Sequence, residues 1–292
     1  MKILLTGTSG QVGYELHQAL RGAAELVTPS RNEMDLANLA QIREFIQQVK
    51  PDIIINPGAY TAVDKAETEA DLAMTINAHA PAVMAEEARK LGAAIVHYST
   101  DYVFDGTKEG PYVEDDPTSP CNVYGKTKVA GEQAIQASGA RHLILRTSWV
   151  YSLRGNNFLL TMLRLASQRD ELRIVADQHG APTWSRTIAR TTARMLPALL
   201  AHDQPDMQGI YHLTAQGQST WYGFARTIFE KAMPDRKLSV IPIASSEYPV
   251  PAPRPKNSVM SSEKLMARFG SLPAWQDALS ECLNEMPVGL SR

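Results

Sequence analysis

The chain has 292 residues, of which 44% are hydrophobic and 21% are charged, as in globular proteins. Its 29 basic and 31 acidic residues leave a net charge of −2, which gives no electrostatic footprint for nucleic acid or a membrane surface. Cys121 and Cys282 are too few for a disulfide framework and lack metal-ligand spacing. No apolar run is long enough for a signal peptide or a membrane span, so we expect a cytoplasmic protein.

The first half of the chain alternates short apolar runs with longer segments of helical periodicity. Continuous apolar runs of this length are typical of strands buried on both faces of a parallel sheet. We therefore expect a doubly wound α/β sheet of the Rossmann type with right-handed crossovers. The expected strands are 2–6, 25–29, 52–56, 94–100 and 142–151, and the expected helices are 11–22, 39–50, 69–92 and a segment beginning at 122.

After residue 151 the pattern is less regular, and a proline-rich segment, 248–258, precedes the terminal helical segment. We expect a dinucleotide-binding domain over 1–150 and a smaller, partly interleaved α/β substrate domain over 151–292, with about 180–215 returning to the first domain. The second domain would close over the carboxyl edge of the sheet, where ligands of such folds bind. The expected helices are about 157–169, 185–200 and 220–233, the expected strands are 172–176, 209–215 and 238–243, and 177–184 is an expected loop.

A glycine-rich loop follows the first expected strand and opens the first expected helix. Gly7 would allow a tight turn, Gly10 a close approach of pyrophosphate to the backbone, and Gly13 tight packing of helix on strand. The N-terminus of the helix would face the phosphates, because its free N–H groups and its dipole favour anions. The loop predicts a dinucleotide cofactor in contact with Gly7, Gly10, Gln11, Val12 and Gly13.

Tyr124 and Lys128 are four residues apart in an expected helix, so their side chains share one face. A neutral phenol is no counter-ion for lysine, which excludes a salt bridge as the reason for the pair. A neighbouring ammonium favours the phenolate and lowers a pKa that is ordinarily near ~10. The pair therefore indicates a general acid/base, with an ordinary surface helix as the alternative.

The glycine spacing G-x-x-G-x-x-G together with Tyr-x-x-x-Lys resembles the extended short-chain dehydrogenase/reductase family. A series of further stretches, in order through nearly the whole chain, resembles the dTDP-4-dehydrorhamnose reductase family within it. These stretches are NPGAYTAVDKAE (56–67), HYSTDYVFDG (97–106), NVYGKTKVAGE (122–132), RTSWVY (146–151), GNNF (155–158), DQHGAPT (177–183) and RPKNS (254–258).

The resemblance implies roles for three catalytic residues. Thr100 would hydrogen-bond the substrate carbonyl oxygen, and Tyr124 would deliver a proton to that oxygen as hydride reaches the carbon. Lys128 would hold the nicotinamide ribose hydroxyls and lower the pKa of the phenol. Donors at this oxygen stabilise the alkoxide charge that develops there. The resemblance also implies cofactor contacts for Ala59, Tyr60, Thr61 and Tyr98, with a purely structural buried aromatic as the alternative for Tyr98.

Three further residues are implied substrate ligands, each with a simpler alternative. Asp101 would bind a sugar hydroxyl or form a turn. Trp149 would stack on the sugar or fill the core between the domains. Arg254 would pair with the nucleotide diphosphate or lie in solvent. Ser99, His97, His179 and His212 are interpreted as structural residues.

The segment after the second expected strand bears on the choice of cofactor. Ser30 and Arg31 stand where NAD-specific enzymes carry an acid, which favours a 2′-phosphate and hence NADPH. Glu33 and Asp35 leave NADH possible, and Asp35 with Leu36 is also a candidate for the adenine pocket.

Some relatives are dimers bridged by a metal through acidic side chains. Glu15 could serve in such a site, but the segment 184–190 offers no acid to complete it. We therefore expect no metal, and either a monomer or a homodimer.

The resemblance implies an NADPH-preferring reductase of the 4-keto group of dTDP-4-dehydro-6-deoxy-L-mannose, which would form dTDP-L-rhamnose for carbohydrate biosynthesis. One alternative is another nucleotide-sugar epimerase or dehydratase of the family. A second is a non-catalytic NADP-binding regulatory subunit similar to methionine adenosyltransferase β. Similar dehydratases read Thr-Asp-Glu where this chain reads Thr100-Asp101-Tyr102, and a tyrosine cannot replace the carboxylate base near neutral pH.

Overall fold

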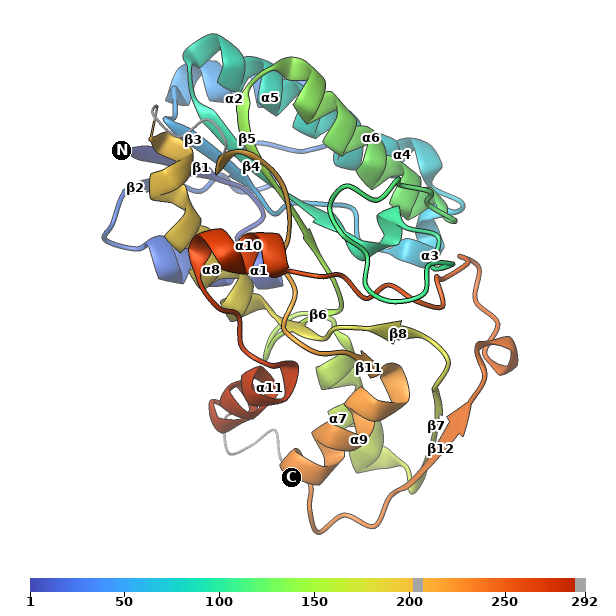
Figure 1. Cartoon of the computed structure of the whole chain (residues 1–292). Coiled ribbons are helices and arrows are strands. Elements are labelled where there is room, and N and C mark those ends of the chain that lie inside the picture. Colours follow the sequence, from blue (N-terminus) through green and yellow to red (C-terminus); the bar gives the residue numbers. More distant parts are fainter. Residues whose placement is uncertain (202–206, 287–292) are drawn as a thin grey trace.

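A parallel sheet of six strands forms the centre of the structure, a computed structural model that describes residues 1–201 and 207–286 (Figure 1). The strand order is β10-β5-β4-β3-β1-β2, and every pair is parallel. The order reverses between β1 and β3, which opens a crevice at the carboxyl edge of the sheet. The strands are β1 (Lys2–Leu5), β2 (Glu25–Val27), β3 (Ile53–Asn56), β4 (Ala94–Thr100), β5 (Arg141–Thr147) and β10 (Gly209–His212).

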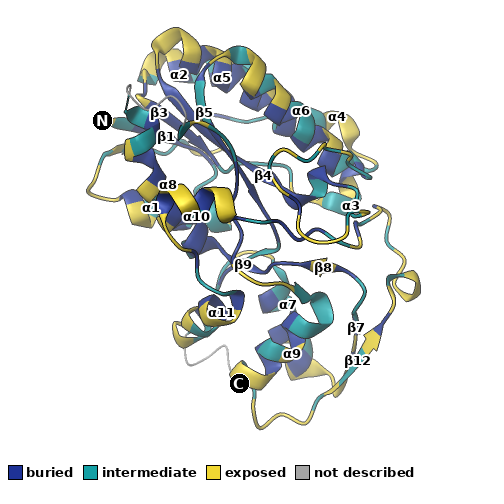
Figure 2. Ribbon diagram, viewed as in Figure 1, coloured by how far each residue is buried: buried dark blue, intermediate teal, exposed yellow. Residues whose placement is uncertain are grey.

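Helices cover both faces of this sheet, so its central strands are buried (Figure 2). Successive side chains of a strand point to opposite faces. In β1, Ile3 and Leu5 therefore belong to one core cluster and Leu4 to another. The predicted doubly wound sheet is confirmed. The first cluster lies under α1 (Gln11–Leu20), α8 (Ser185–Leu200) and α10 (Glu263–Phe269), and the second under α2 (Leu39–Val49), α5 (Ala80–Leu91) and α6 (Val123–Ser138).

The segment predicted as one helix over 69–92 is interrupted by a wider turn, so that prediction is wrong in part. α4 (Ala70–Met74) passes into a π-helical turn, η1 (Thr75–His79), before α5 begins. Asn77 in this turn accepts the backbone N–H of Tyr60 at 2.8 Å and donates to the hydroxyl of Thr127 at 3.0 Å. These bonds tie the loop after β3 to α6, so tertiary contacts account for the break.

A smaller lobe contains most of the remaining elements (Figure 1). Its core buries aromatic side chains, among them Tyr151, Phe224 and Trp275. Its strands form short pairs, β7 with β12, β6 with β9, and β8 with β11. The elements outside the sheet domain are β6 (Val150–Tyr151), α7 (Phe158–Gln168), β7 (Glu171–Val175), β8 (His179–Gly180), β9 (Thr183–Trp184), β11 (Ser219–Thr220), α9 (Trp221–Ala232), β12 (Ser239–Ile243), η4 (Ser245–Glu247) and α11 (Trp275–Asn284), while α3 (Val63–Ala66) and η2 (Asp101–Val103) follow β3 and β4.

The chain leaves the sheet at Trp149, inside the single strand predicted over 142–151. β5 ends at Thr147 and β6 begins at Val150, because Trp149 adopts a φ of 48°. This left-handed conformation is unfavourable for a residue other than glycine and cannot continue a strand. The expected loop 177–184 likewise contains the short strands β8 and β9.

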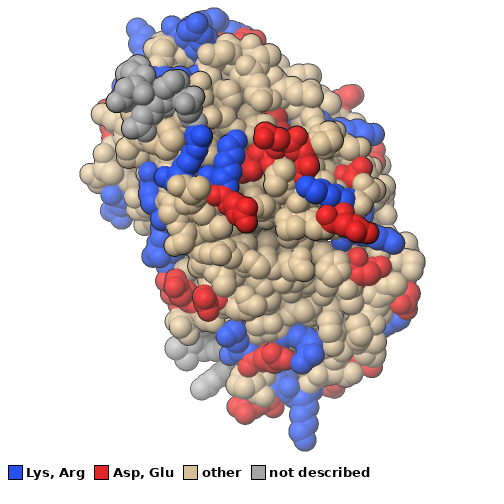
Figure 3. Space-filling model, viewed as in Figure 1, with Lys and Arg blue, Asp and Glu red and all other residues tan. Residues whose placement is uncertain are grey.

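No helix in residues 1–201 and 207–286 combines the length and the apolar character needed to cross a membrane. On the face drawn in Figure 3, acidic and basic side chains are interspersed. This distribution agrees with the small net charge of the sequence.

Candidate active site

The carboxyl end of β4 and the first turns of α6 bring the three predicted catalytic residues together. Thr100 ends β4, and its hydroxyl accepts the N–H of Tyr102 at 3.1 Å. Tyr124 lies in the first turn of α6, where its ring meets the Tyr102 ring edge-on at 6.1 Å and its hydroxyl interacts with Thr100. Lys128 follows one turn later and is 1% exposed.

α6 approaches the sheet closely because its sequence permits it. Asn122 caps the helix by accepting the N–H of Gly125 at 2.7 Å. A Cβ atom on Gly125 would lie 2.2 Å from the carbonyl oxygen of Tyr102, and one on Gly131 would lie 2.2 Å from that of Asn77. Glycine at both positions is therefore required to hold Tyr124 against the end of β4.

The predicted lowering of the Tyr124 pKa by Lys128 is wrong in this structure. Burial raises the pKa of Tyr124 to about 12, although hydrogen bonding with Thr100 opposes the rise. Burial also lowers the pKa of Lys128 to about 8, opposed by the carboxylate of Glu132. The Lys128 Nζ atom is 3.0 Å from Nε2 of His97. The dominant effect on Tyr124 is therefore desolvation, which helical spacing does not reveal.

Asp101 is a buried carboxyl group beside Thr100. It is 3% exposed, and burial raises its pKa to about 6, although the side chains of Ser258 and Thr100 oppose the rise. Its Oδ1 atom accepts the hydroxyl of Thr100 at 2.9 Å, whereas Oδ2 has no partner within hydrogen-bond distance among the described residues. A buried carboxylate oxygen without a donor is costly, and a ligand hydroxyl would satisfy it.

The glycine loop has the shape that a pyrophosphate requires. Gly7 has a φ of 57°, and a Cβ atom there would lie 2.9 Å from the backbone of Gly58. A Cβ atom on Gly13 would lie 2.1 Å from the carbonyl oxygen of Gly7, so only glycine lets α1 pack this closely. The first turn of α1, which carries Gln11 and Val12, contains no acidic residue, and its positive end is free of a competing carboxylate.

Of the predicted nucleotide ligands after β2, Ser30 and Arg31 are exposed, and Asp35 and Leu36 are half-buried. The side chain of Arg31 is 79% exposed, with Nε 3.6 Å from Oδ1 of Asp35. Glu33 accepts the backbone N–H of Ser30 at 2.8 Å, so this acid serves the turn. Leu36 reaches across to the loop after β3, where a Cβ atom on Gly58 would lie 2.7 Å from its Cδ1 atom.

Tyr60, after β3, and Tyr98, on β4, each form a hydrogen bond through the side-chain hydroxyl. Ala59, Tyr60 and Thr61 follow the switch point, and the Tyr60 hydroxyl donates to Oε2 of Glu69 at 2.6 Å. Tyr98 is 7% exposed within the core under α8, and its hydroxyl pairs with that of Thr192 at 2.8 Å. For Tyr98 the structure matches the alternative of a buried aromatic.

Trp149 belongs to an aromatic stack at the entrance to the smaller lobe. Its ring lies 3.6 Å from that of Trp221 with 7° between the planes, and Phe158 packs on Trp221 at 4.6 Å. A Cβ atom on Gly180 would lie 2.4 Å from the Trp149 ring. The sequence analysis did not identify Trp221, because only the tertiary structure places it on Trp149.

Arg254 lies beside the catalytic strand end but is already paired. Its Nη1 and Nη2 atoms donate to the carboxylate of Asp64 at 3.0 and 2.9 Å. This contact holds the pKa of Asp64 below its ordinary value. Arg254 is therefore held by Asp64 and is not the solvated residue of the alternative.

His97 is fully buried, as its interpretation as a structural residue implies. Its ring lies between Lys128 and Asn56, a contact that the sequence interpretation does not include. Strand alternation offers a signal, since Ile95 faces the core under α6 and His97 is two residues further along.

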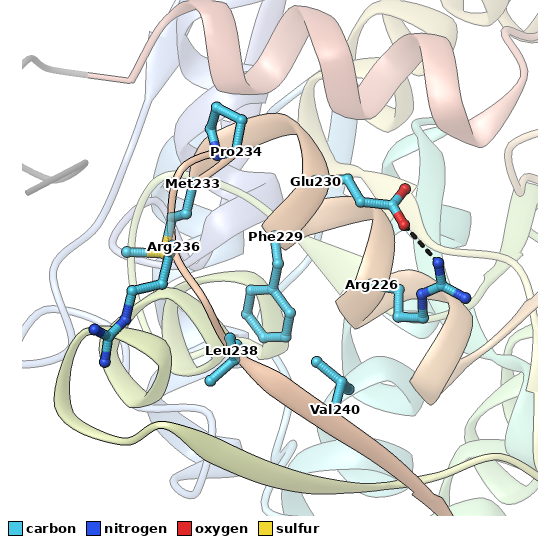
Figure 4. A pocket seen from close by; sticks show the side chains of 8 residues that line it. All are labelled: Arg226, Phe229, Glu230, Met233, Pro234, Arg236, Leu238 and Val240. Atoms are coloured by element: carbon cyan, nitrogen blue, oxygen red, sulfur yellow. Dashed lines mark hydrogen bonds and ion pairs between the residues drawn. The ribbon is translucent and has the colours of Figure 1, made fainter.

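Glu15 pairs with Arg186, whose Nε atom donates to its Oε2 atom at 2.9 Å, and Arg186 also contacts Glu285. In residues 1–201 and 207–286, no group of three or more His, Cys, Asp or Glu side chains could hold a metal ion. A pocket of about 240 Å³ lies on the smaller lobe between α9 and β12 (Figure 4), with Phe229, Leu238 and Val240 in its wall. It contains none of the predicted site residues.

Known proteins are similar to this chain over nearly its whole length. The family model described as RmlD substrate binding domain matches residues 1–288. A dTDP-4-dehydrorhamnose reductase of Burkholderia thailandensis is 46% identical over 98% of this chain and 99% of its own. A solved dTDP-4-dehydrorhamnose reductase of Clostridium acetobutylicum has a TM-score of 0.91 at 38% identity, covering 97% of this chain and 99% of that one. The enzyme of Bacillus anthracis, solved in complex with NADP, has a TM-score of 0.91 at 34% identity, covering 98% and 99%. Similarity of this degree over nearly the whole of both chains shows that the chain belongs to the dTDP-4-dehydrorhamnose reductase family of the extended short-chain dehydrogenases/reductases.

Proposed function

We propose that the chain reduces the 4-keto group of dTDP-4-dehydro-6-deoxy-L-mannose with NADPH and releases dTDP-L-rhamnose. The observation that carries this proposal is the meeting of Thr100, Asp101 and Tyr124 at the carboxyl end of β4. Relatives that bear this activity in their names match over nearly the full length, which supports the choice of substrate.

The chain's own residues fit a dinucleotide. The tight turn at Gly7, the close packing of α1 at Gly13 and the acid-free first turn of α1 form a loop and helix N-terminus that suit a pyrophosphate. A relative solved with NADP supports the same cofactor. When bound, the reduced nicotinamide supplies the hydride. Arg31 carries the proposed preference for NADPH, because its exposed guanidinium can meet a 2′-phosphate once it leaves Asp35.

Tyr124 is the proposed proton donor. Its pKa of about 12 keeps the phenol protonated near neutral pH, the state that an acid needs. The Thr100 hydroxyl donates to Oδ1 of Asp101 in this structure and would turn to the same carbonyl oxygen when the substrate binds. The two donors would then stabilise the developing alkoxide. The unpartnered Oδ2 atom of Asp101 would accept a sugar hydroxyl and so orient the ring.

The residue after Asp101 argues against elimination of water. Burial raises the pKa of Tyr102 above its ordinary value, so this side chain is a neutral phenol. A dehydratase needs a base at this place, and a neutral phenol cannot remove the proton. The site therefore favours reduction of a ketone that another enzyme has made.

The test is to follow the absorbance of reduced nicotinamide after adding the dTDP-4-keto-6-deoxy sugar, prepared from dTDP-glucose with the preceding enzymes. We expect oxidation of NADPH only with this ketosugar, and dTDP-L-rhamnose as the product. dTDP-glucose alone is the matched control and should give neither oxidation nor dehydration.

Two outcomes would redirect the proposal. Tight NADPH binding without turnover would indicate a regulatory subunit. Dehydration of dTDP-glucose by the protein alone would indicate a dehydratase.

A further inference from the structure

A row of buried polar side chains crosses the sheet and ends at Lys128. Thr6 follows β1, Asn56 ends β3, His97 lies on β4 and Lys128 on α6, and none is more than 2% exposed. The Thr6 hydroxyl donates to Oδ1 of Asn56 at 2.6 Å. The Asn56 amide nitrogen is 3.3 Å from Nδ1 of His97, and Lys128 Nζ is 3.0 Å from Nε2 of the same ring.

Lys128 needs an acceptor at this depth. An ammonium group removed from water is stable only if its N–H groups are paired. Glu132 lies nearby, one turn further along α6, but its two oxygens accept Nε and Nη2 of Arg146 at 2.9 and 2.7 Å. The lone pair of His97 is therefore the acceptor that the structure places on Nζ.

The His97 ring is neutral, since burial and the charge of Lys128 hold its pKa well below the ordinary value. A neutral imidazole has one N–H and one lone pair. If Nε2 accepts from Lys128, then Nδ1 carries the proton and must donate to Asn56. A half-turn of the Asn56 amide presents Oδ1 to His97 and Nδ2 to Thr6 at the same distances. Oγ1 of Thr6, which accepts the N–H of Gly58 at 3.3 Å, would then accept from Nδ2 as well, and its own proton would turn away from Asn56.

We infer that His97 is a positioning residue that holds Lys128 in place as an ammonium ion, with Asn56 fixing the required tautomer. Two hydrogen-bond patterns of the row are self-consistent. With Asn56 Oδ1 on His97, Nε2 accepts and Lys128 is charged. With Asn56 Nδ2 on His97, Nε2 carries the proton and Lys128 is a neutral amine. The donor–acceptor direction of the hydrogen bonds between Asn56, His97 and Lys128 therefore depends on the charge of Lys128.

Loss of the His97 lone pair should make the ammonium less stable. Burial already lowers the pKa of Lys128 to about 8, so any further fall converts it to the amine near neutral pH. If catalysis needs the ammonium form of Lys128, activity would then be lost at a lower pH in the variant than in the unaltered protein. Other charged or titratable groups around Lys128 and Glu132 include Tyr124 on α6, Asp101 and Tyr102 after β4, Arg146 on β5 and His212 on β10, and the variants below leave all of them in place.

The kinetic test compares His97→Leu with His97→Gln across a pH series. Leucine offers no acceptor, and we expect the basic limb of kcat to move down by about one unit, a roughly tenfold loss above the limb. Glutamine places an oxygen near the position of Nε2 and should restore most of the profile. Val96→Ala is the matched control, because Val96 is equally buried on β4 but faces the opposite core cluster. A leucine variant with the parental profile, or one matched by Val96→Ala, would overturn the inference.

This kinetic readout rests on the proposed function, so a second measurement is made on the unaltered protein without substrate. Nitrogen-15 NMR of the histidine rings, assigned by through-bond correlation, reports the tautomer of His97. Below the pKa of Lys128 we expect the proton on Nδ1 and a bare Nε2. A protonated Nε2 under those conditions would refute the assignment, even if the enzyme reduces the ketosugar.

Discussion

The two lobes bury side chains of different kinds on either side of the candidate active site. The large lobe buries titratable groups, with His97, Lys128 and Asp101 no more than 3% exposed. The smaller lobe contributes the Trp149–Trp221 stack and a core of aromatic rings. Desolvation shifts the pKa of His97, Lys128 and Asp101. The aromatic rings of the smaller lobe do not titrate near neutral pH and contribute mainly packing surface. Changes in the large lobe should therefore alter turnover and its pH dependence, and changes in the smaller lobe should alter recognition of the sugar nucleotide.

The largest effect is expected for Tyr124→Phe. Removing the hydroxyl leaves the ring packing but takes away the proton donor, so kcat should fall about 10²–10⁴-fold with NADPH affinity unchanged. Steady-state kinetics and fluorescence titration with NADPH measure the two quantities. Tyr151→Phe is the control in the other lobe, because the hydroxyl of Tyr151 has no hydrogen-bond partner among the described residues. Parental turnover in Tyr124→Phe would exclude this tyrosine as the acid.

Asp101→Asn tests whether buried charge in the large lobe costs stability. The pKa of Asp101 rises from 3.8 to about 6 on folding, so the folded state binds its proton more tightly than the unfolded state. The stability that this group contributes is fully present below pH 3.8, its ordinary pKa, and is lost as the pH rises through about 6. The total loss in the free energy of unfolding is on the order of 3 kcal/mol. The asparagine variant should lack this loss and be more stable than the parent at neutral pH. Denaturant unfolding at several pH values measures the difference, and parallel curves for the two proteins would contradict it.

Trp221→Ala tests the recognition role of the smaller lobe. Without its stacking partner, the Trp149 ring is less well held, and we expect KM for the sugar nucleotide to rise about tenfold, as for an aromatic pair of ~1.4 kcal/mol. Cofactor affinity should not change. Phe229→Leu is the matched control. Phe229 is a buried residue of the same helix, α9, but it lines the pocket between α9 and β12 and is not part of the Trp149–Trp221 stack. An equal loss of cofactor affinity in Trp221→Ala would contradict a specific role of Trp221 in binding the sugar nucleotide.

The smallest effect is expected at the exposed edge of the large lobe. Arg31→Ala should raise KM for NADPH by about fivefold and leave KM for NADH unchanged, since a solvated guanidinium contributes little. Arg226→Ala, which removes an exposed arginine of the smaller lobe, is the control. The same change of KM for both cofactors in Arg31→Ala would disprove contact with a 2′-phosphate.

Much of the fold and of the candidate site could be predicted from the sequence, because these features depend on residues close together along the chain. Apolar runs and helical periodicity predicted the strands and helices of the doubly wound sheet, because side-chain spacing is fixed by backbone geometry. Gly7 and Gly13 predicted the dinucleotide loop, since their conformation or close approach tolerates no side chain. Helical spacing alone placed Tyr124 and Lys128 on one face.

Only the tertiary structure decided what surrounds those residues. Burial raises rather than lowers the pKa of Tyr124, and it depends on segments far away in sequence. The same holds for His97 behind Lys128, for Asp64 on Arg254 and for the turn at Asn77, each formed by contacts between separate elements. Sequence spacing determines which side chains share an element, whereas desolvation and pairing between elements are properties of the packed chain.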